Sequence, residues 1–320
     1  MSAATGDFGT PEQFTAYQTR RRQELWGLLG DLPPRRTPCA RLLGTERGPG
    51  YTLERLELDL NGLEVAPALL LVPDKRRDPA PGLLYLHAHG DNYDLGKEEL
   101  LVGRDVLKAY APVCAEKGLV TLAIDSWCFS GRKHKPGARG EHDAFKFMLW
   151  QGQVLWGMML FDEFQAVTYL MSRPEVDPKR IGAFGLSMGS TKAWWLAALD
   201  PRVTCSANLC CLTDYEELIK IDNLAGHGVY YYVPGLLKHF QAHEICELIV
   251  PRAHLSLNGR RDLLTPPAGV ERIREHLMPL YRKYGRESDC RIELEDCAHE
   301  ETPTMRAAVL EWFDRHLLGA

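Results

Sequence analysis

The sequence predicts an α/β fold in which helices cover both faces of a mostly parallel central sheet. From residue 82 onward, short apolar runs alternate with longer segments of helical periodicity, as expected for buried parallel strands connected by helices. Before that point, residues 51–72 alternate apolar and polar side chains around Asn61-Gly62, a dipeptide typical of tight hairpin turns. We therefore expect an N-terminal antiparallel hairpin at one edge of the sheet.

The other elements follow from the same patterns. An amphipathic helix is expected over residues 11–30, ending near Gly30 and Pro33-Pro34. Further strands are expected at 82–87, 119–124, 181–184, 203–209, 253–258 and 291–295. Further helices are expected at 99–117, 154–172, 188–199, 268–284 and 303–317.

The 320-residue chain is expected to form a single domain over residues 1–320, because α/β architectures often exceed the usual domain size. Residues 1–50 would form an N-terminal helical extension. Two stretches, 131–150 and 212–250, interrupt the alternation of strands and helices. Loops of this length in a compact domain are usually functional, so we interpret both as lid-like insertions over the site.

The composition disfavours several classes of partner and location. A net charge of −5 argues against nucleic acid or an anionic membrane as the main partner. The N-terminus MSAATGDFGT lacks the basic and apolar regions of a signal peptide, and no apolar run reaches the ~18–20 residues that span a bilayer. Nine cysteines without a CxxC pair then predict reduced thiols in the cytoplasm.

The strongest chemical signal is Gly185-x-Ser187-x-Gly189, which follows the expected strand at 181–184 and precedes the expected helix at 188–199. A sharp strand-to-helix turn of this kind exposes a serine hydroxyl at the carboxyl edge of the sheet, beside the positive end of the helix. We therefore predict that Ser187 is a nucleophile. The alternative is a glycine-rich turn that serves only packing.

A serine nucleophile needs a base, and the chain supplies one in the usual order of serine, acid and histidine. Asp262 follows the expected strand at 253–258, and His299 follows the strand at 291–295. Strand ends of a parallel sheet meet at one edge, so His299 would act as general base and Asp262 would orient its imidazole. Asp296 is the competing acid, ranked second because it lies so close to His299 in sequence.

Attack on a carbonyl also needs N–H donors for the oxyanion. The backbone N–H of Met188 is expected to be one donor, and that of His89 the other, with Gly90 as the near alternative. His87 is expected to be structural. His87 and His89 could instead be two metal ligands, with His134 and His142 available, but their spacing has no recognisable signature. The sequence therefore predicts no metal.

Aromatic residues are frequent in the segments expected to surround the site, and such residues suit an apolar or planar substrate group. The candidates for the substrate pocket are Trp127, Phe145, Trp150, Tyr230 and Tyr231. Core packing is the alternative for most of them. Glu141, His142 and Arg132 could bind a polar end of the substrate or be solvated charges. Trp194-Trp195 are expected in the core or at an interface, which leaves a homodimer open.

In this order the motifs resemble those of the α/β-hydrolase superfamily, in particular the branch of dienelactone hydrolases and acetyl xylan esterase-like enzymes. The resemblance runs from about residue 50 to the C-terminus. It rests on His87-x-His89-Gly90, Gly96-Lys97-Glu98, Asp125 through Gly131-Arg132, Ser172 to Asp177 before Ile181-Gly182, Gly185 to Gly189, Arg261-Asp262 and Ala298-His299.

The resemblance implies hydrolysis of esters or related acyl compounds without a cofactor. Two departures matter: Ala88 stands where many relatives have glycine, and the nucleophile is serine where dienelactone hydrolases proper use cysteine. We expect a serine hydrolase that cleaves carboxylic esters of a small or medium-sized molecule through an acyl-enzyme. A serine peptidase or amidase, or a non-hydrolytic lyase or acyltransferase on the same fold, are the alternatives.

Overall fold

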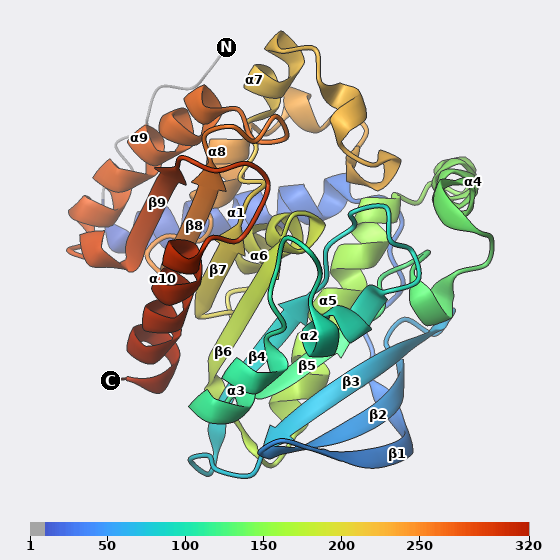
Figure 1. Ribbon diagram of the computed structural model, residues 1–320. Helices are drawn as coiled ribbons and strands as arrows, with labels where there is room; N and C mark the ends of the chain where they lie inside the picture. Colours follow the sequence, from blue (N-terminus) through green and yellow to red (C-terminus); the bar gives the residue numbers. More distant parts are fainter. Residues whose placement is uncertain (1–9, 320) are drawn as a thin grey trace.

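A computed structural model of the chain describes residues 10–319, and its centre is a sheet of nine strands (Figure 1). The strands lie in the order β1-β2-β3-β5-β4-β6-β7-β8-β9. Their bounds are β1 Cys39–Gly48, β2 Tyr51–Asp59, β3 Val65–Pro73, β4 Ala80–Leu86, β5 Val120–Ile124, β6 Val176–Leu186, β7 Cys205–Leu209, β8 Ala253–Gly259 and β9 Cys290–Glu295. The sheet confirms the predicted α/β-hydrolase architecture.

The antiparallel part of the sheet consists of β1, β2 and β3, and β3 pairs antiparallel with β5. β2 and β3 form the predicted hairpin, with Asp59 opposite Val65 beside the Asn61-Gly62 turn. One expectation needs correction: residues 1–50 were predicted to be a helical extension, but β1 lies within them. Residues 1–9 of that extension lie outside the described residues. They make up most of the segment on which the signal-peptide argument rests.

From β5 to β9 all neighbouring strands are parallel. Every residue of β4, β5, β7 and β8 is buried, as expected for parallel strands that are covered on both faces. All parallel strands therefore end at one edge, where the predicted site residues follow β4, β6, β8 and β9.

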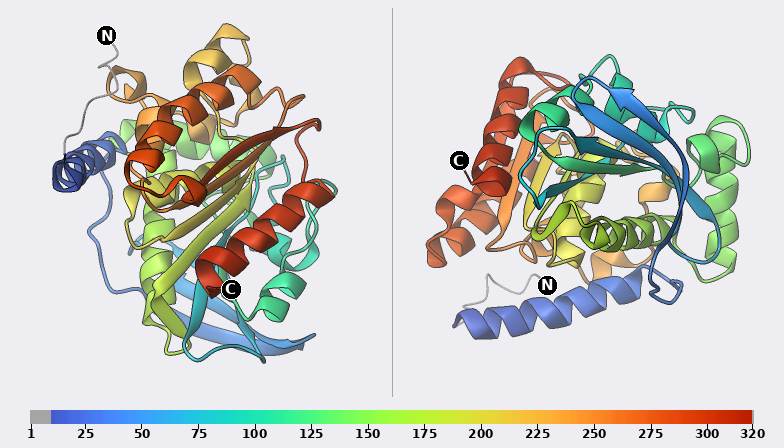
Figure 2. Two further views of the ribbon diagram at one scale, coloured as in Figure 1. Left: turned by 90° about the vertical axis from the view of Figure 1, so that its left-hand side faces the viewer. Right: turned by 90° about the horizontal axis from the view of Figure 1, so that it is seen from below.

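Helices cover both faces of the sheet (Figure 2). One hydrophobic core packs α1 (Pro11–Leu28), α5 (Leu155–Ser172), α6 (Met188–Leu199) and α9 (Pro267–Lys283) against the sheet, with α1 on the outside of that layer. The other core packs α3 (Ala111–Lys117) and α10 (Pro303–Phe313) against the opposite face. Thr10 begins α1 with a capping box, in which its hydroxyl accepts the Gln13 N–H and its N–H donates to the Gln13 side chain.

The helix predicted over residues 99–117 is two short helices, α2 (Glu99–Val102) and α3. Gly103 ends α2 with φ of 67°, and a side chain at this position would overlap the backbone of Leu107 and Ala109. The chain turns sharply here, so the apolar pattern that predicts one long helix is divided between two.

The two predicted insertions have structure of their own. Residues 131–150 contain most of a 3₁₀ turn (Ser130–Arg132) and α4 (Gly137–Trp150). Residues 212–250 contain α7 (Tyr215–Lys220), α8 (Ala242–Cys246) and 3₁₀ turns at Leu224–Gly226, Val229–Tyr231 and Leu236–Lys238. In Figure 1 the segment around α7 lies above the arrowheads of β8 and β9. Their role as lids stays a prediction.

Two further expectations concern surfaces. Trp194 and Trp195 are fully buried in the core, so they offer no exposed aromatic surface to a partner, and the homodimer stays a prediction without their support. Within residues 10–319, none of the helices is both long and apolar enough to cross a membrane.

Candidate active site

Ser187 lies at the turn between β6 and α6, where it is the N-cap residue of the helix with φ of 59° and ψ of −120°. Such a positive φ is unfavourable for a residue with a side chain and is typical of a strained functional turn. The flanking glycines explain how the turn closes. A Cβ atom at Gly185 or Gly189 would collide with the carbonyl oxygen of Leu86, so only glycine allows α6 to begin this close to β4.

Asp262 and His299 meet as predicted, although they are 37 residues apart in sequence. The Nδ1 atom of His299 lies 2.7 Å from Oδ2 of Asp262. The Asp262 carboxylate also accepts the Leu264 N–H at 2.9 Å and the Thr265 hydroxyl at 3.1 Å. Burial alone would raise the pKa of Asp262, but these hydrogen bonds and the imidazole outweigh it and hold the pKa below its ordinary value.

The competing acid, Asp296, points elsewhere. Its side chain is 79% exposed and forms an ion pair of 2.5 Å with Arg261. The structure therefore selects Asp262 rather than Asp296 as the carboxylate that contacts His299.

Ser187 and His299 line the same cleft, which has a volume of about 550 Å³. The loop after β4 forms one wall, α4 a second, and the 212–250 insertion a third. Residues of these walls include His89, Gly90, Tyr93, Ala138, Glu141, His142, His227, Tyr230, Tyr232 and Leu264. The cleft thus lies at the carboxyl edge of the sheet and is walled by both predicted insertions.

The loop after β4 is held by a buried carboxylate. Glu99 accepts the backbone N–H of Ala88 at 3.1 Å and the hydroxyl of Tyr85 at 3.0 Å, and it pairs with Arg104 at 2.6 Å. Because the Ala88 N–H is engaged here, this donor is committed to the loop rather than to the cleft. His89 and Gly90, the two residues predicted for the oxyanion site, are the ones that line the cleft.

His89 connects this loop to α4. Its Nδ1 atom accepts the Asp91 N–H at 3.1 Å, so the proton is on Nε2, which donates to Oε2 of Glu141 at 2.7 Å. The same Glu141 oxygen accepts the Tyr93 hydroxyl at 3.0 Å. Glu141 Oε1 accepts the Tyr230 N–H at 3.4 Å. One buried carboxylate therefore joins the β4 loop to both insertions.

The two histidines that could have been metal ligands have protein partners on all four ring nitrogens. His87 Nε2 accepts the Ser126 N–H at 3.1 Å, and Nδ1 lies 2.9 Å from the Ala88 carbonyl. Burial, helped by the Lys192 ammonium, lowers the pKa of His87 well below its ordinary value. These contacts give His87 the structural role that its position at a strand end predicts.

Cys210 lies beside the acid and the base, a feature that the sequence argument missed. Its sulfur and ligand atoms of Asp262 and His299 all lie within 4.8 Å of one another. Burial, together with the Asp262 charge, raises the pKa of the Cys210 thiol well above its ordinary value. The available signal was its place directly after strand β7, at the same edge of the sheet.

The predicted aromatic pocket is partly wrong. Tyr230 lines the cleft, and Tyr231 lies behind it in a neighbouring cavity. Trp150 is 88% exposed at the C-terminal end of α4, and Phe145 packs against the core. Trp127 lines a different cavity, where the Arg132 guanidinium lies 4.3 Å from its ring. The helical period of α4 explains this, because it presents Ala138, Glu141 and His142 to the cleft.

His227 is a cleft residue that the sequence argument did not consider. It stacks on Tyr231 with ring centroids 4.6 Å apart, and its Nε2 atom lies 3.0 Å from the Leu264 carbonyl oxygen. Burial lowers its pKa, which favours a neutral ring. No motif surrounds it in the sequence, so only the fold brings it to the site.

Comparison with known proteins gives consistent results. The family described as acetyl xylan esterase (AXE1) matches residues 130–252. A relative named "Putative hydrolase YtaP", from Bacillus subtilis, is 43% identical over 302 residues, which cover 94% of this chain and 100% of the relative.

Solved structures share the fold at low sequence identity. A glucuronoyl esterase from Solibacter usitatus matches with a TM-score of 0.67 and 15% identity, covering 97% of this chain and 95% of that one. Acetyl xylan esterase 1 from Thermoanaerobacterium sp. matches with a TM-score of 0.55 and 19% identity, covering 96% and 95%.

Proposed function

Since this chain is an ester-bond hydrolase of the α/β-hydrolase superfamily and belongs to the family of the Bacillus subtilis protein named "Putative hydrolase YtaP", we propose that Ser187, His299 and Asp262 form its catalytic triad. The observation that carries the proposal is the 2.7 Å contact between His299 Nδ1 and Asp262 Oδ2, beside the cleft that Ser187 and His299 both line.

In this mechanism Asp262 keeps the His299 proton on Nδ1 and leaves Nε2 free to act as the base. Nε2 takes the Ser187 proton as the hydroxyl oxygen attacks the ester carbonyl carbon. The lowered pKa of Asp262 keeps its carboxylate charged at neutral pH, which stabilises the imidazolium that this step creates. His299 then gives the proton to the leaving alcohol.

The oxyanion that forms on the carbonyl oxygen needs N–H donors that are in place beforehand. Met188 N–H at the start of α6 is the first, supported by the positive end of the helix. The second comes from His89 or Gly90. Water activated by His299 hydrolyses the acyl-enzyme, which frees Ser187 and releases the acid.

The substrate is a carboxylic ester of a small or medium-sized molecule. A cleft of about 550 Å³ falls within the usual range for small-molecule sites. The matching family and the solved structures of similar fold are all named as esterases. These names favour ester cleavage over the peptidase, amidase, lyase and acyltransferase alternatives.

Rates on matched leaving groups test this choice. We expect p-nitrophenyl acetate to be hydrolysed with a kcat/KM at least 100-fold above that of p-nitroacetanilide, with a burst of p-nitrophenol if deacylation is slow. A preference for the anilide would make the amidase alternative correct. Failure to release acid from any ester, with transfer to an added alcohol instead, would favour an acyltransferase.

A further inference from the structure

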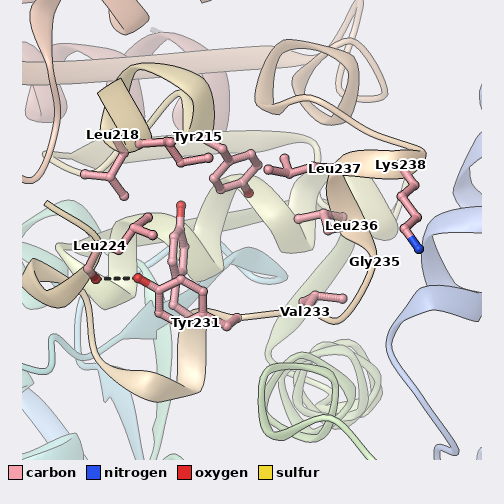
Figure 3. A pocket seen from close by; sticks show the side chains of 11 residues that line it. Tyr215, Leu218, Leu224, Tyr231, Val233, Gly235, Leu236, Leu237 and Lys238 are labelled. Carbon is pink, nitrogen blue, oxygen red and sulfur yellow. Dashed lines mark hydrogen bonds between the residues drawn. The ribbon is translucent and has the colours of Figure 1, made fainter. Parts of the chain in front are cut away.

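The 212–250 insertion contains a second cavity, which the mechanism does not use. It has a volume of about 440 Å³, and all of its lining residues belong to the insertion. Figure 3 shows side chains that gather around it, including Tyr215, Leu218, Leu224, Tyr231, Val233 and Leu236. We call this cavity the insertion pocket.

The insertion pocket adjoins the catalytic cleft. Leu224 and Tyr232 line both cavities, so the two share a wall. The Tyr232 hydroxyl donates a hydrogen bond to the Leu224 carbonyl oxygen, drawn as a dashed line in Figure 3, and this bond ties the two sides of the wall together. The two cavities are therefore neighbours across this wall, and an alkyl chain on an ester bound at Ser187 has to pass Leu224 and Tyr232 to enter the insertion pocket.

The lining favours an uncharged, apolar occupant. Aliphatic side chains dominate it, and burial raises the pKa values of Tyr215 and Tyr231 above their ordinary value near 10, at which a phenol is already uncharged at neutral pH. Lys238 lies at the rim, and its amine points away from the aromatic wall in Figure 3. The insertion pocket thus offers mostly apolar surface, with the Lys238 ammonium at its rim as the charged group among its lining residues.

We propose that the insertion pocket binds the alkyl chain of an ester substrate whose carbonyl group lies at Ser187. This inference rests on the proposed function and adds its substrate class, esters that carry a medium-length alkyl chain. The chain can belong to the acyl half or to the alcohol half of the ester. Two substrate series distinguish these sources.

The first series consists of p-nitrophenyl acetate, butanoate, hexanoate and octanoate, and the second of acetate esters of ethanol, butanol, hexanol and octanol. Each methylene buried from water is worth about 0.8 kcal/mol, so kcat/KM should rise roughly fourfold per added methylene until the pocket is full. A rise in the first series places the alkyl chain on the acyl side, and a rise in the second places it on the alcohol side. Two flat series would overturn the proposal.

Two variants link the trend to this pocket. Leu237 is half-exposed at the rim, and the first variant is Leu237→Trp. The larger ring should lower the ratio of kcat/KM for the six-carbon substrate to that for the two-carbon substrate at least ~10-fold in whichever series rises. Leu224→Ala thins the shared wall, so its optimum should shift to a longer chain. The ratio within one variant is independent of the folded fraction, so partial misfolding does not affect it.

Leu42→Trp is the matched control, because Leu42 is also a half-exposed leucine (57% exposed, against 43% for Leu237) but lies on β1 and lines neither cavity. It should keep the wild-type ratio. An unchanged ratio in both Leu237→Trp and Leu224→Ala would overturn the inference. If Ser187→Ala abolishes turnover while both substrate series stay flat, the insertion pocket alone is wrong. If Ser187→Ala keeps turnover, the proposed function itself fails.

Discussion

The Nε2 atom of His89 lies 2.7 Å from the Oε2 atom of Glu141, which connects the loop after β4 to helix α4 through one buried hydrogen bond. The carboxylate that makes this contact is 1% exposed and also accepts the Tyr93 hydroxyl. A displacement of α4 would therefore move the loop that carries a proposed oxyanion donor. If the β4 loop carries the oxyanion donor as proposed, the first insertion would act on the chemistry through this hydrogen bond without contacting the reacting bond.

Replacement of Glu141 by alanine should lower kcat about 10- to 100-fold with little change in KM. The variant leaves the His89 N–H without its acceptor, so the β4 loop loses its fixed position, whereas ground-state binding in the cleft is largely kept. Steady-state kinetics on p-nitrophenyl acetate measure the two constants separately. Glu141→Gln, which retains one acceptor oxygen, should recover part of kcat.

Lys146→Ala, an exposed position on the same helix, is the control and should behave as wild type. Glu141 would have no positioning role if Glu141→Ala changed KM alone, or if Glu141→Ala and Lys146→Ala had the same kcat and KM.

The identity of the acid is tested by a pair of substitutions at aspartates that lie 34 residues apart. Asp262→Asn should reduce kcat by on the order of 10⁴-fold, because an amide would favour the wrong imidazole tautomer and give no charge to stabilise the imidazolium. Asp296→Asn, which removes only an exposed ion pair with Arg261, should stay within about twofold of wild type. The reverse result would assign the acid to Asp296.

Asp262 should also make stability depend on pH in the acidic range. Its pKa in the folded chain is lower than in the unfolded chain, where it is near 3.9. The stabilisation that follows is fully present above the unfolded pKa and is lost as the pH falls through the folded pKa. We expect the difference in unfolding free energy between wild type and Asp262→Asn to shrink below about pH 4.

Urea unfolding of both proteins at pH values from 7 to 3 measures this difference. A gap that stays constant, or widens, toward acid pH would show that the Asp262 pKa is not lowered by folding.

The turn at the nucleophile should tolerate no side chain at Gly189. A Cβ atom there would overlap the Leu86 carbonyl oxygen, so Gly189→Ala should destabilise the fold by about 1–3 kcal/mol or more and displace Ser187. Gly27→Ala is the matched control. Nothing lies within 4 Å of a Cβ atom at Gly27, and the exchange in α1 should stabilise the chain by up to about 1 kcal/mol.

Thermal denaturation compares the two glycine variants directly. Equal melting temperatures would mean that α6 does not begin as close to β4 as the structure shows.

The convergence of Asp262 and His299 could be predicted because it depends on chain order alone. Each follows a strand of the parallel sheet, and such strands end at one edge, so a correct assignment of strands places the residues together. The spacing of Gly185 and Gly189 around Ser187 also allowed the sharp turn at the nucleophile to be predicted. None of this required knowledge of side-chain packing.

Features that depend on packing escaped prediction. The side chains of β1 are exposed on both sides along almost its whole length, so its sequence CARLLGTERG shows no alternation that would indicate a strand. Trp150 looks like a pocket residue by composition, but its position at the end of α4 turns it to solvent. His227 joins the site only through the path of a loop, which no local pattern encodes.

The central claim is that Ser187 is the residue that becomes acylated. Incubation with a fluorophosphonate probe, followed by mass spectrometry of the digested protein, tests this claim most directly. We expect stoichiometric labelling on the peptide that contains Ser187, with loss of ester hydrolysis in proportion, and neither labelling nor turnover in Ser187→Ala. Labelling at another residue, or an Ser187→Ala variant that hydrolyses p-nitrophenyl acetate at the wild-type rate, would contradict the account.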